Sequence, residues 1–367
     1  MKPGIIETVI NVLRFACISA LISPAFAVEV KDFGIEVPGV ESIRWIDNDR
    51  LALVGLVHVP DRAITHYAGQ RIGKLVILDT RTGKAEWHEE FFGRFCYDGQ
   101  NFAVSSVDDI YHPSNNSHEY HFWIMRGSPG KLVRKEVTRD YLNSFDFTMA
   151  CKGEDERQLP PWLESAKKSG RVFRALKQEH GWLEMAYADA FDSHHQRTYP
   201  LAIHPPGSEN KPYPIDQSQF RPWFEKAYSL HLLRYEPFKN AYLLAAPNGM
   251  DGHKEGMLWW MYPDGRLEEF LKFKQQGEWG GVSYRNLIPT ARDMLIVATK
   301  TPPQQNWGLY RVTAANRLEL VVKGWAEGGG KAVSPDGCKV AFGIDPRGYP
   351  NTRYQLQIVD VCERNSK

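Results

Sequence analysis

Histidine and aspartate, residue types that often bind metals or transfer protons, gather in a few polar segments of this sequence. One segment runs from Asp108 to His121, and others lie near His66, His194 and His253. A histidine beside an aspartate could ligate zinc or act as an acid and base, but ligand binding without catalysis is the favoured interpretation. The candidate ligand-binding residues are Asp61, Arg62, His66, Asp108, Asp109, His112, His118, His121, His194, His195, Asp251, His253, Trp307 and Arg347.

The common catalytic motifs are missing from the sequence. It contains no G-x-S-x-G, no H-E-x-x-H, no C-x-x-C and no phosphate-binding loop. No cofactor or metal is therefore expected. Two functions stay open: a binding or scaffold protein, which is favoured, and a hydrolase or lyase that acts on a glycan or another small substrate. An enzyme would need two or three of the candidate acids and histidines to converge, whereas scattered placement would favour binding.

The first 27 residues have the features of a secretory signal peptide. Lys2 and Arg14 lie in the polar leading part, Phe15–Ile22 is a short apolar run, and Ala25–Ala27 is a small-x-small cleavage site. The apolar run is too short for a stable membrane anchor, and later apolar runs are shorter still. We expect a periplasmic or secreted protein without a transmembrane segment.

Removal of residues 1–27 leaves 43 basic and 43 acidic residues in the mature chain, 28–367. A neutral chain without a basic run is a poor binder of nucleic acids. The expected partner is an unidentified protein or glycan.

Short β-prone runs and tight turns recur every 45–55 residues or so, a period that points to the blades of a propeller. The first unit has four runs, Ser42–Ile46, Leu51–Val59, Lys74–Asp79 and Ala85–Phe91. Similar units follow, apart from an irregular blade with an insertion at about 143–220. The β-prone runs of that blade are Phe145–Ala150, Arg171–Lys177, Trp182–Ala188 and Thr198–His204. The sequence therefore predicts a single all-β propeller domain with six four-stranded blades, and seven blades as the alternative.

The ends of the chain predict how this ring closes. The last unit lacks a fourth strand after the run Tyr354–Val361, while Val28–Val37 is an unassigned β-prone run. A propeller closes well when its N-terminal strand completes the last blade, because two exposed edges disappear.

The connections between the second and third strands of each unit are longer than the other turns. In a propeller all of these connections emerge on one face, which we expect to be the functional face because loops on a rigid scaffold usually carry binding. In the second unit, Asp108–Ser117 is expected to be such a loop, between the strands Phe102–Val107 and Tyr120–Arg126.

Four cysteines lie beyond the signal peptide. An even number in an oxidising compartment suggests two disulfides, with three possible pairings. Cys338 and Cys362 lie at facing ends of neighbouring strands, and Cys96 and Cys151 are placed in the innermost strands of adjacent units. The predicted disulfides are therefore Cys96–Cys151 and Cys338–Cys362.

One segment resembles a known repeat. Ala332–Gly337, followed by Lys339–Phe342, is similar to the repeat of TolB-type periplasmic propellers, and WD-repeat-like propellers carry similar units. The resemblance covers about 12 residues of one blade and implies a propeller fold. In that family the Ser-Pro-Asp-Gly element is a structural turn, so the resemblance assigns no functional residue. The wider family includes scaffolds, receptors and the propeller domains of peptidases.

Overall fold

The structure is a computed structural model in which the regular elements are almost entirely β-strands. The helices that lie wholly within the part that it describes are three 3-10 helices, Gln178–His180, Gln217–Gln219 and Pro237–Lys239. None of the helices in this part is long and apolar enough to cross a membrane. The described residues are 29–38, 43–58, 71–91, 95–97, 101–112, 114–128, 131–139, 163, 171–187, 198–207, 211–219, 230–248, 255–274, 286–292, 294–298, 307–312, 318–325, 331–346 and 354–362.

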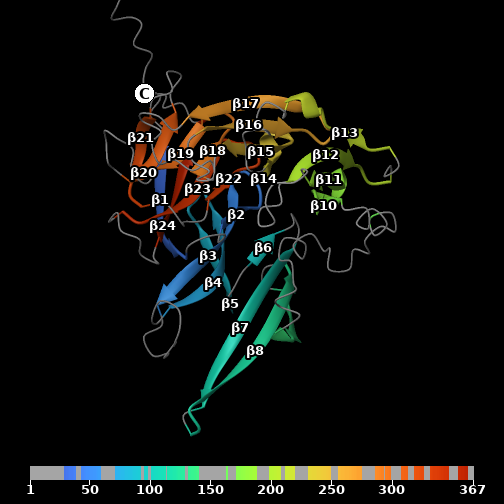
Figure 1. The fold of residues 1–367 in the computed structure, drawn as a ribbon. Coiled ribbons are helices and arrows are strands. Elements are labelled where there is room, and N and C mark those ends of the chain that lie inside the picture. Colours follow the sequence, from blue (N-terminus) through green and yellow to red (C-terminus); the bar gives the residue numbers. More distant parts are fainter. Residues whose placement is uncertain are drawn as a thin grey trace, which may run out of the picture.

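The described strands form six four-stranded antiparallel sheets (Figure 1). In five of them each strand pairs with the next along the chain, which is the organisation of propeller blades. The sheets are β2 (Ile43–Trp45), β3 (Arg50–His58), β4 (Arg71–Asp79) and β5 (Ala85–Phe91); β6 (Phe95–Tyr97), β7 (Phe102–His112), β8 (Ser117–Gly127) and β9 (Val133–Val137); β10 (Val172–Ala175), β11 (Trp182–Tyr187), β12 (Thr198–His204) and β13 (Tyr213–Pro214); β14 (His231–Glu236), β15 (Ala241–Asn248), β16 (Glu255–Met261) and β17 (Leu267–Lys274); β18 (Leu287–Pro289), β19 (Met294–Ala298), β20 (Gly308–Val312) and β21 (Leu318–Lys323); and β1 (Glu29–Val37), β24 (Tyr354–Asp360), β23 (Lys339–Ile344) and β22 (Lys331–Val333).

The Ser-Pro-Asp-Gly segment forms the tight turn between β22 and β23. The Ser334 hydroxyl accepts a hydrogen bond from the backbone N–H of Lys339 at 2.8 Å, and the Asp336 carboxylate accepts one from Cys338 at 3.0 Å. Gly337 has a φ of +76°, a conformation that strains any residue with a side chain. Local sequence thus accounts for this turn without any functional role.

The strand β1 completes the last sheet. It pairs antiparallel with β24, with Glu29 opposite Asp360 and Val37 opposite Tyr354. The prediction that 28–37 supplies the missing strand of this blade is confirmed. Because β1 lies against β24, it covers a backbone edge that would otherwise be free to pair with another chain.

Apolar cores lie between successive sheets. Trp259 and Trp260 point to opposite faces of β16, so that one packs with β10–β12 and the other with β18–β21. Both tryptophans therefore pack between neighbouring sheets. Further clusters join β18–β21 to the last sheet, that sheet to β2–β5, and β2–β5 to β6–β9. Among the described residues, no cluster joins β6–β9 to β10–β13.

The region 143–220 contributes one sheet, as expected, but its strands differ from the prediction. The expected run Phe145–Ala150 lies outside the described residues. The fourth strand is Tyr213–Pro214, in which Tyr213 pairs with Ile203. The sequence could not reveal it, because two residues carry no periodic pattern and a proline argues against a strand.

The structure joins Cys338 and Cys362 in a disulfide, with 5.2 Å between their Cα atoms. This predicted pairing is confirmed. The predicted pairing of Cys96 with Cys151 lies outside the described residues. That pairing therefore stays a prediction.

Candidate functional site

The second sheet extends well beyond its four-stranded part. In the described structure, β6 pairs with Phe102–Val104 of β7, and β9 pairs with Phe122–Arg126 of β8. Beyond these pairs, β7 and β8 continue as a two-stranded hairpin that projects away from the other sheets (Figure 1). We call this two-stranded part, residues 108–112 and 117–121, the arm.

The arm corrects the expectation of a loop at 108–117. The strand β7 runs to His112 and β8 begins at Ser117, so that each strand has eleven residues in continuous register. The expectation was wrong because polar residues were interpreted as a loop signal. Backbone pairing does not depend on polarity, and β-prone residues such as Ile110 and Tyr120 alternate with the polar ones.

Asparagines form the turn at the tip of the arm. Asn116 has a φ of +50°, in the left-handed region that asparagine adopts more readily than most residues. The Ser117 hydroxyl donates to the Asn115 side-chain oxygen at 2.7 Å, and the Asn115 N–H approaches the His112 carbonyl at 3.4 Å. This local chemistry fixes where the two strands reverse.

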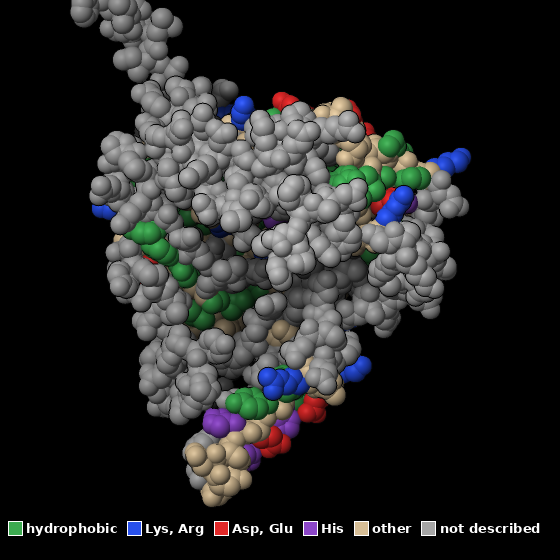
Figure 2. All heavy atoms as spheres, viewed as in Figure 1, with side chains coloured by type: hydrophobic (Ala, Val, Ile, Leu, Met, Phe, Trp, Pro, Cys, Tyr) green, Lys and Arg blue, Asp and Glu red, His purple; other side chains and the backbone are tan. Residues whose placement is uncertain are grey.

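A row of alternating histidines and glutamates crosses the arm. His112 Nε2 lies 3.0 Å from one oxygen of Glu119, and His121 Nε2 lies 3.1 Å from the other. His121 Nδ1 lies 2.9 Å from Glu136 of β9. Figure 2 shows histidine and acidic side chains gathered on the arm. We call these four residues the His–Glu row.

Ionisation of the His–Glu row follows from these contacts. The hydrogen bond with His112, together with the charge of His121, lowers the pKa of Glu119 below its ordinary value. The hydrogen bond with Glu136 is the largest cause that raises the pKa of His121, and Glu119 adds to it against a smaller opposing effect of burial. The row is bonded most strongly when its glutamates are ionised and His121 is protonated.

Aromatic side chains flank the row. The rings of His118 and Tyr120 stack with 6.1 Å between their centroids, and Tyr120 is 51% exposed. At the base of the arm, the Arg134 guanidinium lies 3.7 Å from the centre of the Trp123 ring. Exposed aromatic and charged side chains on a rigid strand pair are typical of a surface that binds another molecule.

A second polar cluster is buried in the third sheet. His204 Nε2 lies 2.6 Å from Glu184, which also contacts Arg171, and both Glu184 and His204 are buried. The neighbours of Glu184 along β11 point into the core shared with β14–β17, so the pair lies on the other face of its sheet. Sequence reasoning missed this cluster, although a lone glutamate in the apolar strand Trp182–Tyr187 signals a buried charge that needs a partner.

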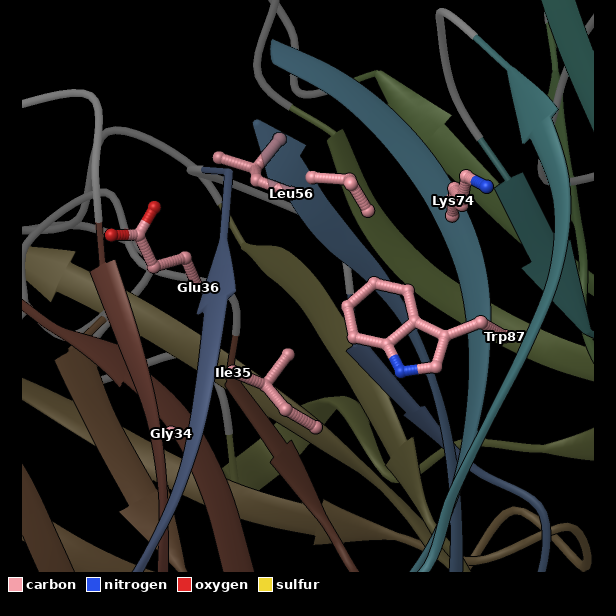
Figure 3. Close-up of a pocket in the computed structure, with 7 residues that line it drawn as sticks. Gly34, Ile35, Glu36, Leu56, Lys74 and Trp87 are labelled. Carbon is pink, nitrogen blue, oxygen red and sulfur yellow. The ribbon is translucent and has the colours of Figure 1, made fainter. Parts of the chain in front are cut away.

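A groove of about 560 Å³ lies between β1 and the first sheet (Figure 3). Trp87 is 43% exposed, and its ring lies over Gly55, where a Cβ atom would come within 2.6 Å of a ring carbon. The closing strand thus also builds a recess of a size that small ligands occupy. Its lining residues are Gly34, Ile35 and Glu36 from β1, and Leu56, Val57, Lys74 and Trp87 from the first sheet.

The structure brings together some of the residues expected from the sequence. His112, His118 and His121 lie on the arm, where the backbones of Asp108 and Asp109 pair with those of His121 and Tyr120. The ring of Trp307 lies 3.7 Å from that of Trp325. The described residues include no cluster of three or more His, Cys, Asp or Glu that could hold a metal ion. Outside the described residues lie Asp61, Arg62, His66, His194, His195, Asp251, His253 and Arg347.

No protein-family model and no characterised protein sequence matches this chain. Among solved structures, it resembles the β-propeller domain of the Trilobed protease from Pyrococcus furiosus, with 11% identity and a TM-score of 0.46 over 90% of this chain and 95% of that one. It also resembles a eukaryotic initiation factor, with 13% identity and a TM-score of 0.35 over 88% and 92% of the two chains. For the acylaminoacyl peptidase of Pyrococcus horikoshii the identity is 10% and the TM-score 0.29, over 87% of this chain and 43% of that one. Likenesses at this level carry no information about function.

Proposed function

We propose that this chain is an exported binding protein, a closed six-bladed propeller that uses the arm to engage a partner protein. The observation that carries the proposal is the arm itself, a two-stranded extension beyond a four-stranded sheet. An isolated two-stranded hairpin is at best marginally stable in water. A chain that maintains one on a rigid scaffold places it where a second molecule can cover it.

The ring rests on the pairing of β1 with β24 and on the apolar cores between neighbouring sheets. Each core needs two sheets face to face, which is how blades pack around a propeller axis. The closed ring makes the scaffold rigid. A rigid scaffold lowers the entropic cost of presenting the arm to a partner.

Binding is favoured over the alternative of a hydrolase or lyase. Catalysis needs acids and bases that converge on one reacting atom. The candidate histidines and aspartates that the structure describes lie along the arm instead, and Glu119 is already bonded to His112 and His121. Such a row suits recognition of a surface better than proton transfer in a closed site.

The proposed compartment is the periplasm or the cell exterior. The signal-peptide features of residues 1–27 favour export. The disulfide Cys338–Cys362 supports the same compartment, since disulfides persist where the environment is oxidising.

An arm-shortened variant tests the binding role. Val107 and Phe122 are paired across the hairpin, so an Asn-Gly turn can join them and replace residues 108–121 without disturbing the four-stranded part. Intact and shortened chains would be produced in the native cell and cross-linked there, and the products analysed by mass spectrometry. We expect a defined cross-linked partner with the intact chain and its loss with the shortened one.

Tyr213→Ala is the matched control. Tyr213 is 44% exposed in the outer strand of another sheet, so this substitution also removes an exposed aromatic ring but leaves the arm intact. The control should retain the partner. A partner that stays cross-linked to the shortened chain would refute the binding role of the arm.

A further inference from the structure

The groove between β1 and the first sheet presents part of a tryptophan ring to solvent (Figure 3). Trp87 of β5 is 43% exposed, although tryptophan is on average a highly buried residue. Its ring lies over Gly55 of β3, where a Cβ atom would come within 2.6 Å of one ring carbon and 2.7 Å of another. The glycine therefore lets the ring lie close against the sheet, which fixes it as a platform on one wall of the groove.

The closing strand departs from regular pairing where it forms the opposite wall. Between Asp32 and Glu36, three residues of β1 lie opposite one residue of β24. Gly34 in this bulge has a φ of +64°, and its N–H donates to the Asp32 carboxylate at 2.8 Å. Bulges redirect side chains and are common beside binding sites. This one shapes the part of β1 that faces Trp87 across the groove (Figure 3).

Groups of opposite charge lie on the two walls. Glu36 of β1 and Lys74 of β4 both line the groove, beside the apolar side chains of Ile35, Leu56 and Val57. An anionic ligand would meet the carboxylate and a cationic ligand would meet the ammonium group, whereas a neutral ligand with hydroxyls can bond to both. A carboxylate accepts several hydrogen bonds and an ammonium group donates several, so each can keep bonds within the protein and still bind a hydroxyl.

A pyranose ring matches both the platform and the charged groups. One of its faces carries C–H groups, which are attracted to the negative face of an indole ring, and its rim carries hydroxyls. An aromatic side chain of a partner protein could also stack on Trp87. It would, however, cover Glu36 and Lys74 without replacing their hydrogen bonds to water, which costs free energy. The volume of about 560 Å³ lies within the range of small-molecule sites.

We infer that this groove binds a neutral sugar residue of a glycan, with the sugar ring stacked on Trp87 and its hydroxyls bonded to Glu36 and Lys74. None of the residues that line the groove belongs to the arm. The inference therefore goes beyond the proposed role of the arm and does not depend on it.

Saturation-transfer difference NMR with the purified mature protein tests this inference. The probes are neutral tetrasaccharides of glucose, mannose, galactose and N-acetylglucosamine, and the affinity of the best binder is then measured by calorimetry. We expect saturable binding of at least one of these probes. Trp87→Leu keeps an apolar side chain on β5 but removes the aromatic face, so it should weaken binding by about tenfold or more.

Control variants and control probes separate the groove from other surfaces. Tyr213→Ala removes another exposed aromatic ring, in the outer strand of a different sheet, and should leave the affinity for the sugar unchanged. The arm-shortened variant should also bind the sugar like the unmodified protein. N-acetylphenylalanine amide and the acidic tetrasaccharide of galacturonic acid should both bind more weakly than the best neutral probe. Circular dichroism of each variant would show that the fold is retained.

The outcomes separate this inference from the proposed function. Absence of saturable binding of every neutral probe, an unchanged affinity of Trp87→Leu, or tighter binding of either control probe would each overturn a neutral sugar site in the groove. Loss of sugar binding in the arm-shortened variant would place the sugar on the arm and overturn it as well. In each case the cross-linking experiment still decides whether the arm engages a partner protein.

Discussion

Deletion of the closing strand should destabilise the protein severely. A chain that begins at residue 38 lacks β1, in which Val37 is completely buried and Ile35 is 6% exposed. Burial of each such side chain stabilises a fold by about 1.5–3 kcal/mol, so the direct loss is about 3–6 kcal/mol. Since whole domains are stable by about 5–15 kcal/mol, much of the free energy of unfolding would disappear.

The arm-shortened variant provides the internal comparison. Among its deleted residues, the side chains that the structure describes include the exposed Tyr120 and Glu119, and none of these described side chains belongs to an apolar core. Thermal unfolding followed by circular dichroism should show a drop on the order of 10 °C or more without β1, and a change of a few degrees without the arm. Size-exclusion chromatography should show aggregates only for the first variant, because it exposes the edge of β24. Equal melting temperatures for the two variants would refute the closed ring.

Three further predictions concern single contacts. Replacing Cys338 and Cys362 by serine should lower the free energy of unfolding by about 3–4 kcal/mol, as expected for a cross-link between residues 24 apart in sequence; denaturant titration measures this loss, and an unchanged midpoint would contradict it. His121 should titrate above its ordinary pKa of 6.5 in NMR spectra, and Glu136→Gln should bring the pKa down; its stabilising contribution is complete below pH 6.5 and is lost as the pH rises through the raised value. Glu184→Ala should lower the free energy of unfolding, measured by thermal unfolding, by about 3 kcal/mol, because it leaves Arg171 and the buried His204 without their carboxylate. A decrease of less than about 0.5 kcal/mol would show that the cluster is not a buried ion pair.

The sequence predicted the parts of the fold that follow from local residue patterns and from the number of strands in each unit. Turn residues such as those at Ser334–Gly337 located hairpins, because the backbone angles they require are local properties. The missing strand after β24 and the spare strand at 29–37 could be matched because a propeller leaves no other place for either. The antiparallel pairing expected for the last unit also predicted that Cys338 and Cys362 lie close enough for a disulfide.

The features that escaped prediction depend on pairing between distant segments. The histidines and aspartates at 108–121 give no sign in the sequence of whether they lie in a loop or in a ladder, because strand length is set by backbone pairing rather than by polarity. The contact of Glu184 with His204 likewise depends on the register of β11 against β12. A continuous apolar run such as Met257–Met261, by contrast, indicates from local sequence alone a strand that is buried on both faces.

The His–Glu row helps to hold the two strands of the arm in register, as the proposed binding role requires. Apolar cross-strand pairs would stabilise the hairpin more strongly, but on an exposed strand pair they would invite aggregation. Ion pairs between exposed groups stabilise a fold only weakly, but a linked row such as His112, Glu119, His121 and Glu136 can hold the strands in register while the surface stays solvated. The arm is then ordered enough to present its side chains, yet its stability is low enough that the proposed partner would add substantially to it. That balance suits a binding element, since a fully self-sufficient hairpin would gain little from being covered.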